Sequence, residues 1–403
     1  MGKTTRATLT EGCGARKKIA FVHLGKVPIA NITVSRVLKK VFCDYEVEEI
    51  DVLQRIKKDR VFIVINTIVM VREYGFKLLM GYRRRWNCFF TTTYAFKYIK
   101  RLVAELIDED QHVFSFQMQS LFDASKAGVP HFVYTDHTYL ANLNYAHYDK
   151  RNLPSEAWLA LERRVYQNAE LVFVRSAHVR ESLLTHYDRP HNSVECVYAG
   201  NNASDADTRR FEQKKKNILF VGIDWDRKGG PELISAFRQV LVSHPDAELT
   251  IVGCTPECDI PQCTVVGKVP VERIGQYYEE ATLFCLPTKV ESFGVAFVEA
   301  LHYGLPIVGS DVGAVPDMVS PARNGYLVPP GDVHALAEKL VQLLDHPEVC
   351  RRFGEQSKIM ASERYNWNNV GGLFKQHIEK RFLLGTRNQV MIETAPNVLA
   401  SGV

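Results

Sequence analysis

The sequence lacks an apolar run long enough to cross a membrane. Its longest candidate, 61–71, reaches about half the length of a membrane-spanning helix. Residues 1–18 are polar and carry no apolar signal region, so we expect a cytoplasmic protein rather than a secreted one. The nine cysteines are then expected to be reduced thiols, and no fourth ligand stands at a suitable spacing from Cys254, Cys258 and Cys263. We therefore expect no metal site and no other cofactor.

The chain also lacks a large net charge, at +4, and its composition of 46% hydrophobic and 24% charged residues excludes a wholly disordered protein. A length of 403 residues exceeds what one hydrophobic core usually supports. These numbers predict a globular chain of two domains.

The charge that is present is unevenly placed. Between residues 55 and 101 only Asp59 and Glu73 are acidic, and nine aromatic side chains are interspersed from Tyr74 to Tyr98. The cations of this segment are residues 55, 57, 58, 60, 72, 77, 83, 84, 85, 97, 100 and 101. Such a segment suits an anionic membrane surface or an anionic acceptor, the alternative being a solvated basic face over an ordinary core. No recognised nucleic-acid-binding motif accompanies it, so we expect no nucleic acid as partner.

Short apolar runs alternate with helical periodicity along both halves of the chain. Strand candidates in the first half are 18–24, 45–52, 112–116, 130–135, 171–174 and 194–198, and those in the second are 218–221, 249–252, 264–266, 283–286, 306–309 and 326–328. Strands that alternate with helices are typical of parallel βαβ units. The sequence therefore predicts an α/β protein with two doubly wound, Rossmann-like domains whose strand ends face a shared cleft.

Changes of composition predict the domain boundaries. We expect a flexible tail over 1–16, an N-terminal domain over 17–203, a polar linker over 204–216 and a C-terminal domain over 217–360. A helix over 361–384 is expected to cross back to the N-terminal domain, and 385–403 to be a loose tail.

Two carboxylates eight residues apart, Glu291 and Glu299, are the most informative feature of the chain. They flank the transition from the strand 283–286, through a turn that holds Gly294, to a helix predicted over 293–303. A helix N-terminus after such a turn offers free backbone N–H groups to a phosphate. At about 1.5 Å per residue, Glu299 lies roughly 12 Å beyond Glu291. This spacing suits a diphosphate between a sugar and a ribose, and so predicts a nucleotide-sugar site.

The second half of the chain resembles glycosyltransferase family 4, whose fold is GT-B. The resemblance rests on the motifs Phe220-Val-Gly222, Arg227-Lys-Gly-Gly230, Ile251-Val-Gly253, Glu291 to Glu299, Gly304-Leu-Pro306 and Asn324 to Asp332, in that order over about 130 residues. In the first half it rests only on Gly25 and on Thr135-Asp-His-Thr138. Membership implies retaining transfer from a nucleotide-activated sugar, normally without a metal ion.

The resemblance implies catalytic roles for four residues. Lys228 would neutralise the donor diphosphate, and Arg227 would supply the second cation, because Ile223 stands where relatives carry an arginine. Glu291 would face the sugar, and His137 would point into the cleft from the first domain. The adjacent Asp136 remains an alternative to His137.

Donor-binding roles are implied for six further positions. Glu299 would accept hydrogen bonds from the ribose, and Phe293 and Gly294 would present backbone N–H groups to the donor. The base would be read by backbone atoms around 266–270, which include Val269, so uridine, guanosine and adenosine donors all stay open. The strand glycine Gly222 completes the set in the second half. Gly25, with Lys26 after it, would approach the phosphates or the acceptor; the alternative is a tight strand-to-helix turn.

We therefore predict a retaining glycosyltransferase that acts on a hydroxyl acceptor, such as a lipid-linked or cell-surface glycan intermediate, and that associates peripherally with the inner face of the membrane. A nucleotide-sugar epimerase on the same fold is the alternative enzyme, and a non-catalytic nucleotide-sugar-binding protein is the third reading. A nicotinamide-dependent oxidoreductase is disfavoured, since residues 23–28 lack the expected glycine fingerprint.

Overall fold

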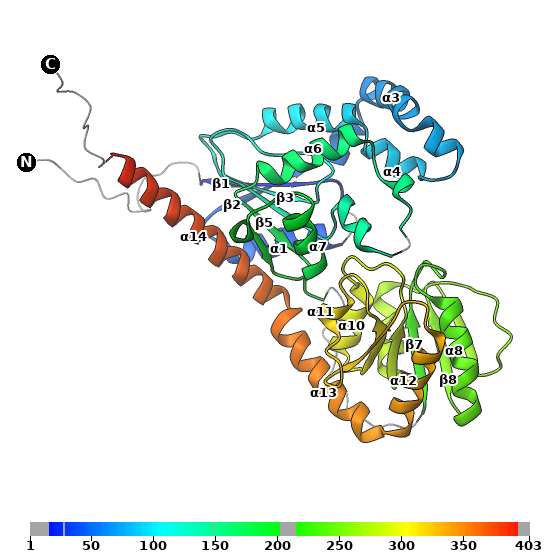
Figure 1. Ribbon diagram of the computed structural model, residues 1–403. Coiled ribbons are helices and arrows are strands. Elements are labelled where there is room, and N and C mark those ends of the chain that lie inside the picture. The colour runs from blue at the N-terminus through cyan, green and yellow to red at the C-terminus, as the bar shows by residue number, and fades with distance from the viewer. Residues whose placement is uncertain (1–15, 27–28, 147, 202–214, 394–403) are drawn as a thin grey trace, which may run out of the picture.

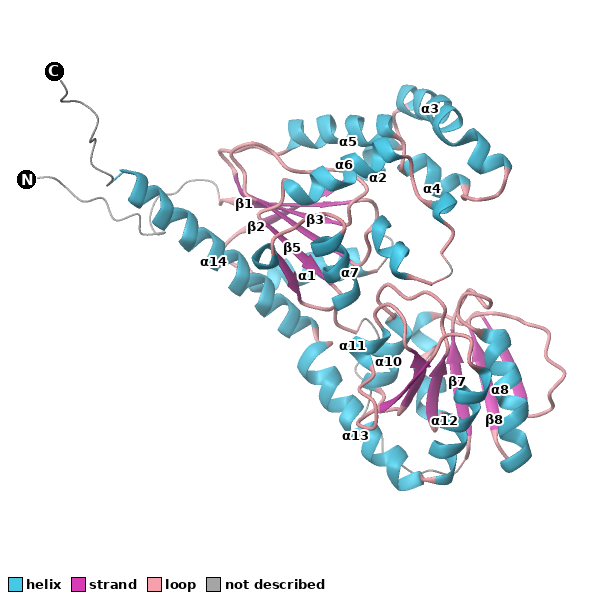
Figure 2. Ribbon diagram, viewed as in Figure 1, coloured by secondary structure: helices cyan, strands magenta, loops and turns pink. Residues whose placement is uncertain are grey.

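The computed structural model of the protein describes residues 16–26, 29–146, 148–201 and 215–393, with side chains as far as Phe382. The predicted tail over 1–16 and linker over 204–216 lie almost entirely outside the described residues. Two sheets and the helices that cover them make up the molecule, as Figures 1 and 2 show.

The N-terminal sheet holds six parallel strands in the order β2-β1-β3-β4-β5-β6. Their bounds are β1 Lys18–His23, β2 Glu46–Asp51, β3 His112–Met118, β4 His131–Thr135, β5 Leu171–Val174 and β6 Val194–Cys196. The central strands β4 and β5 are buried along their whole length, which agrees with the near-continuous apolar runs that parallel strands require. All six strands lie where the sequence predicts them.

Seven α-helices accompany this sheet among the described residues. They are α1 Ala30–Val41, α2 Val52–Ile56, α3 Arg60–Leu79, α4 Arg85–Phe90, α5 Thr93–Leu106, α6 Glu156–Gln167 and α7 Ala177–Thr185. Several begin at a side-chain cap: Asp59 accepts from Phe62 N and Thr92 accepts from Ala95 N. The segment 61–71 therefore belongs to α3, which lies at the end of its domain that is remote from the C-terminal sheet (Figure 1).

The C-terminal sheet repeats the pattern in the order β12-β11-β10-β7-β8-β9, again parallel. Its strands are β7 Asn217–Val221, β8 Glu248–Val252, β9 Cys263–Gly267, β10 Leu283–Leu286, β11 Ile307–Ser310 and β12 Gly325–Val328. Its helices are α8 Gly230–Ser243, α9 Gly275–Glu280, α10 Val295–His302, α11 Val315–Met318, α12 Val333–Asp345 and α13 Pro347–Arg364. The α/β class with two parallel sheets is confirmed.

One long helix, α14 (Trp367–Glu393), joins the two halves by lying along the N-terminal domain (Figure 1). Gly371 admits α1 to close contact, since a Cβ there would lie 2.6 Å from a Val37 methyl carbon. Phe374 is fully buried among the rings of Phe116, Tyr134 and Phe173, with centroids 5.1, 5.1 and 4.9 Å away. The helix continues past Gly385, where the sequence predicts a loose tail, as far as Glu393. Residues 394–403 lie outside the description.

No helix in the described part of the chain is both long enough and apolar enough to span a bilayer.

We predict that Phe374→Ala lowers the free energy of unfolding by about 3–5 kcal/mol, because it leaves a cavity between α14 and the N-terminal sheet. Urea denaturation followed by circular dichroism measures the change. The matched control is Lys375→Ala, whose partly exposed side chain is paired with Glu379 at 3.8 Å and should change stability by less than about 1 kcal/mol. Equal effects of the two substitutions would contradict the packing role of Phe374.

Candidate active site

The loop between β7 and α8 places a lysine against a glutamate from the loop after β10. Gly229 has a φ of 75°, and a Cβ there would lie 1.9 Å from the carbonyl oxygen of Pro287, so only glycine lets the two loops approach this closely. Lys228 forms a buried ion pair with Glu291; the two residues are 9% and 7% exposed. The structure thus brings together two predicted catalytic residues that are far apart in the sequence.

Glu291 is held from a third loop as well. Its carbonyl oxygen accepts a hydrogen bond from Ala314 N at 2.9 Å. Gly313, at a φ of 57°, makes this approach feasible, because a Cβ there would lie 2.0 Å from the same oxygen. The backbone of Glu291 is therefore held by contacts that do not depend on Lys228.

Arg227 connects the same two loops from the side. Its Nε lies 3.2 Å from Oδ2 of Asp224, and its Nη1 donates to the carbonyl of Val290 at 2.9 Å. The guanidinium thus already binds protein groups, Asp224 and the Val290 carbonyl. Ile223, at the position where the family resemblance implies an arginine, is strongly exposed.

Helix α10 begins two residues later than predicted, at Val295, because Gly294 adopts a φ of 91° and caps it. The N–H groups of Gly294, Val295 and Ala296 have no acceptor among the described residues. Gly294 lies against Glu291, since a Cβ there would be 3.3 Å from the Glu291 Cγ. Open donors at a helix N-terminus beside the Lys228–Glu291 pair make an anion-binding corner. Phe293, which precedes them, is buried.

Glu299 lies on α10 with its side chain directed at Tyr278. The Tyr278 hydroxyl donates to Oε2 of Glu299 at 2.7 Å, and Glu299 is 7% exposed. Burial raises the pKa of Glu299, and the hydrogen bond from Tyr278 offsets part of that rise. The Tyr278 ring is stacked on Tyr303 at 5.3 Å, which holds the hydroxyl in place. Glu299 keeps one oxygen that no protein donor occupies among the described residues.

Gly222 and Val269 follow the carboxyl ends of two strands of this parallel sheet, β7 and β9. Gly222 N donates to the carbonyl of Val252 at 2.9 Å, and a Cβ there would lie 3.1 Å from the Lys228 Cγ. Gly222 therefore leaves room for the lysine stem. Val269 follows β9 and packs against the C-terminal core while partly exposed.

His137 faces the C-terminal domain from the loop after β4. It lines a cavity of about 490 Å³ that also includes Asp224 of the other domain. Its Nε2 lies 3.3 Å from the Asn142 amide nitrogen, which donates to it. Burial lowers the pKa of His137, and Asp136 opposes this change, so the imidazole is neutral at neutral pH. Asp136 itself lies 3.5 Å from Arg175, so of the two, His137 is the one that lines the cavity.

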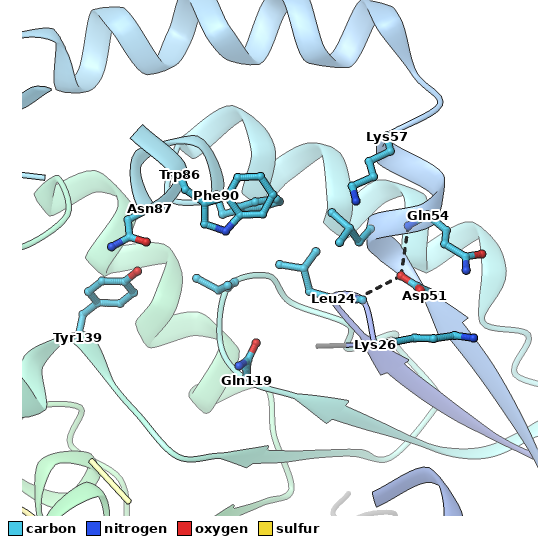
Figure 3. A pocket seen from close by; sticks show the side chains of 13 residues that line it. Leu24, Lys26, Asp51, Gln54, Lys57, Trp86, Asn87, Phe90, Gln119 and Tyr139 are labelled. Carbon is cyan, nitrogen blue, oxygen red and sulfur yellow. Dashed lines mark hydrogen bonds between the residues drawn. The ribbon is translucent and has the colours of Figure 1, made fainter. Parts of the chain in front are cut away.

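Gly25 and Lys26 lie at a different cavity, of about 520 Å³, in the N-terminal domain (Figure 3). Gly25 has a φ of 83°, and its N–H donates to Oδ1 of Asp51 at 3.2 Å. The cavity is bounded by α2 on one side and by Trp86, Phe90 and Tyr139 on the other (Figure 3). Both readings of Gly25, turn and binding loop, agree with this position.

Several residues of the site escape sequence reasoning. Tyr278 is one, because nothing in its neighbourhood marks it as the partner of Glu299. Arg175 is another: this buried cation lies 4.7 Å from the Tyr134 ring and 5.9 Å from the ring of Phe293 in the other domain. Ser176 donates to the carbonyl of Ser292 at 3.1 Å, so the two domains touch at the site itself.

No group of three or more histidine, cysteine, aspartate or glutamate side chains suited to a metal ion occurs within the described ranges. Cys254, Cys258 and Cys263 are free and partly buried.

Two protein families match the chain: "Glycosyl transferases group 1" over residues 202–360 and "Glycosyltransferase Family 4" over residues 58–204. The D-inositol 3-phosphate glycosyltransferase of Corynebacterium glutamicum is 27% identical over 264 residues, which are 58% of this chain and 63% of that enzyme. The chain thus spans about three fifths of the length of this relative.

Solved structures with the same architecture include sucrose-phosphate synthase from Thermosynechococcus elongatus, with a TM-score of 0.61 at 18% identity over 92% of this chain and 100% of that one. The Anabaena protein HepE, in complex with UDP, has a TM-score of 0.61 at 14% identity over 90% and 100% of the two chains. These similarities confirm the predicted GT-B fold.

We predict that Gly229→Ala destabilises the protein by about 2 kcal/mol more than Gly331→Ala does. Both glycines have positive φ values, 75° and 84°, so both alanines carry similar backbone strain. Only at position 229 does the new Cβ collide with a backbone oxygen, because Gly331 has no atom within 4 Å. Urea denaturation of the two variants measures the difference. A loss of stability at 331 as large as at 229 would refute the close approach of the two loops.

Proposed function

Because the chain belongs to the family 4 glycosyltransferases, we propose that it transfers a sugar from a nucleotide-sugar donor to a hydroxyl group of an acceptor, with retention of configuration. The buried Lys228–Glu291 pair beside the open N–H groups of α10 is the observation that carries this proposal. A cation and several unpaired donors at one corner suit a diphosphate.

The donor diphosphate is assigned to Lys228 and to the N–H groups of Gly294, Val295 and Ala296. Phe293, which directly precedes Gly294, is assigned to the same donor-binding turn. Arg227 adds positive charge next to Lys228, and its bonds to Asp224 and to the Val290 carbonyl fix the loop that carries the lysine. As the bond to the nucleotide breaks, negative charge grows on the phosphate, and these groups stabilise it without reorganising.

The ribose is assigned to Glu299. Its raised pKa reflects burial, and a ribose hydroxyl that donates to the free oxygen would favour the ionised form. Tyr278 occupies the other oxygen and so orients the carboxylate. The base would lie near Val269, after β9, and Gly222 would leave space at the phosphates.

The transferred sugar is assigned to the space between Glu291 and His137. Glu291 would accept hydrogen bonds from sugar hydroxyls, and the neutral His137 would hydrogen-bond the sugar or orient the acceptor. In the front-face reaction the acceptor oxygen forms a bond to the anomeric carbon on the face from which the phosphate oxygen departs. The acceptor proton passes to that phosphate oxygen, so no base from the enzyme is required. Closure of the two domains excludes water and limits donor hydrolysis.

The acceptor is assigned to the N-terminal domain, where Gly25 and Lys26 border the cavity of about 520 Å³. A lipid-linked or cell-surface glycan intermediate fits the basic segment 55–101, and peripheral association with the inner face of a membrane follows from the same segment. We also propose that the acceptor domain ends at residue 203, that the donor domain begins at residue 217, and that the chain after residue 360 crosses back to the acceptor domain.

An epimerase on the same fold would convert the donor alone to an isomer, whereas a transferase needs an acceptor. A binding protein without turnover would need a damaged site, yet Glu291, Glu299 and Lys228 are all present and two of them are paired. No specific contact favours either alternative.

We expect one nucleoside diphosphate and its sugar conjugate, from a panel of uridine, guanosine and adenosine compounds, to raise the melting temperature by a few degrees (~2–4 °C). Glu299→Gln should lose most of this shift, since an amide keeps one acceptor for Tyr278 but offers fewer to the ribose. The matched control, Glu338→Gln, changes an exposed carboxylate on α12 and should keep the full shift. No shift with any nucleotide would refute the donor site. If the enzyme converted the donor alone to an isomer, the function would be epimerisation and not transfer.

We expect Lys228→Met to lower the rate of donor cleavage by roughly 10²–10³-fold, because the developing charge on the phosphate loses its cation. The rate can be measured without a known acceptor. The assay uses the nucleotide sugar that raises the melting temperature and follows the nucleoside diphosphate released by its slow hydrolysis. Lys339→Met, on α12, is the control for loss of a lysine charge, because this lysine is also largely covered and paired with a glutamate, Glu338. Lys228→Met alone leaves the buried carboxylate of Glu291 without its cation, which could impair folding. The double variant Lys228→Met/Glu291→Gln also removes this carboxylate, so it separates a folding defect from a catalytic one. Wild-type cleavage rates in both variants would contradict the role of Lys228.

A further inference from the structure

Helix α3 has two apolar faces, of which the described residues cover only one. Phe62, Met70 and Tyr74 are buried at helical spacing and pack into the domain. The opposite face is a continuous stripe whose members are each 58–84% exposed: Val61, Val64, Ile68, Val71 and Leu79. A helix that is apolar all round is normally covered on every side, and an exposed apolar stripe of this kind marks an interaction site.

The charges around the stripe are positive. The two carboxylates of the segment are held internally: Asp59 caps α3 and accepts from the Tyr98 hydroxyl, and Glu73 accepts from Thr93 N at 3.2 Å. Six exposed cations form no ion pair with another described residue: Lys57, Lys58, Arg60, Arg72, Arg84 and Arg85. They lie before the start of the stripe, within it and beyond its end. The exposed charge therefore complements an anionic surface along the whole helix.

Residues that precede and follow α3 in the chain line the cavity to which the acceptor is assigned. Lys57, just before α3, and Trp86, just after it in the chain, line that cavity from opposite sides (Figure 3). Trp86 is also 62% exposed, so it belongs both to the cavity and to the outer surface. Phe76 and Met80, near the end of α3, are exposed as well. Exposed apolar side chains thus occur both on α3 and, through Trp86, at the rim of the cavity.

We propose that the outer face of α3 seats the protein on an anionic lipid bilayer, and that the acceptor is a membrane amphiphile whose polar head enters the cavity between Lys57 and Trp86. The second half of this inference rests on the proposed glycosyl transfer. Aliphatic side chains flanked by cations on a helix that lies in the plane of the interface match the binding of amphipathic helices to anionic membranes. Asp51, Gln54, Asn87 and Gln119 supply the cavity with partners for hydroxyl groups.

This orientation leaves the donor site in water. The helix α3 lies at the end of the N-terminal domain that is remote from the C-terminal sheet (Figure 1). A bilayer in contact with α3 therefore touches the acceptor domain first, while a nucleotide reaches Lys228 and α10 from the aqueous side.

Flotation of the full chain with lipid vesicles tests the docking surface. We expect binding to phosphatidylcholine vesicles that contain phosphatidylglycerol, and weaker binding to phosphatidylcholine alone. Val64→Glu/Ile68→Glu should weaken binding by roughly tenfold or more, because two apolar side chains lose their burial in lipid. The matched control is Val242→Glu, on α8 of the other domain, whose valine is even more exposed than Val64 and Ile68. Arg84→Glu/Arg85→Glu should remove the preference for the anionic lipid, and Arg351→Glu on α13 should not.

Equal binding by Val64→Glu/Ile68→Glu and wild type would overturn the proposed surface. So would a wild-type dimer that Ile68→Glu converts to a monomer without any vesicle binding, because the occupant would then be a second copy of the chain. Light scattering without lipid decides this point. The nucleotide shift of the same preparations reports on the donor site separately, so failure of docking is distinguishable from failure of the proposed function.

Tryptophan fluorescence tests where the mouth of the cavity lies. Vesicles with brominated acyl chains should quench wild type more than Trp86→Phe, because the difference between the two proteins is the signal of Trp86. Vesicle binding with equal quenching of both would place the mouth away from the lipid and overturn the amphiphilic acceptor. Melting curves of all variants without lipid establish that they fold.

Discussion

The ion pair between Lys228 and Glu291 is the contact on which the rest of the site depends. Placing two opposite charges in a buried corner loses solvation that their attraction only partly restores, so such a pair is a poor means of stabilising a fold. Here it is imposed by backbone geometry. Gly229 allows the β7 and β10 loops to approach each other closely, and Gly313 allows a third loop to approach the carbonyl of Glu291. Hydrogen bonds from Lys289 N to the Arg227 carbonyl and from Ala314 N to the Glu291 carbonyl, both of 2.9 Å, join these loops. Three loops at one end of the sheet are thus arranged around a charge pair and a helix N-terminus whose first donors have no acceptor in the part of the chain that the structure describes. This is the arrangement expected of a ligand site rather than of a core.

The N-terminal domain contributes by contact with this corner. Ser176 bonds to the carbonyl of Ser292, Ala177 N bonds to Asp317 at 2.7 Å, and the Arg175 guanidinium lies near the Phe293 ring. These contacts come from the loop and helix after β5, so the strand ends of one sheet touch the loops of the other. The helix α14 supports the same arrangement from outside, since Phe374 packs on the N-terminal sheet while its helix follows directly on α13. The cleft is therefore bounded at the site by direct bonds and behind it by a buried aromatic cluster.

Much of this architecture follows from local patterns in the sequence. All twelve predicted strands are present, because a strand that is buried on both faces leaves an apolar run that flanking turn residues delimit. The glutamate pair and the glycine turn before α10 are local as well. What local patterns do not reveal is pairing across the chain: Lys228 with Glu291, Glu299 with Tyr278, and Arg227 with the Val290 carbonyl instead of a free position. The extent of α3 does not follow from a local pattern either, since its apolar residues lie on both of its faces and obscure the one-sided period that marks a helix packed on a core.

Both substrates of the proposed reaction are assigned to places where groups of the protein are left uncovered by other described residues. In the C-terminal domain the uncovered groups are polar: the first N–H groups of α10 and one oxygen of Glu299. In the N-terminal domain they are apolar and cationic: the outer face of α3 and the lysines and arginines beside it. A diphosphate would take up Lys228, and Glu291 would then be left with a vacant oxygen next to the sugar, so binding of the donor would itself prepare the carboxylate for the sugar hydroxyls. In the proposed orientation, an acceptor held at a bilayer would meet this prepared sugar from the other domain, and the two substrates would reach the cleft from water and from lipid without competing for one entrance.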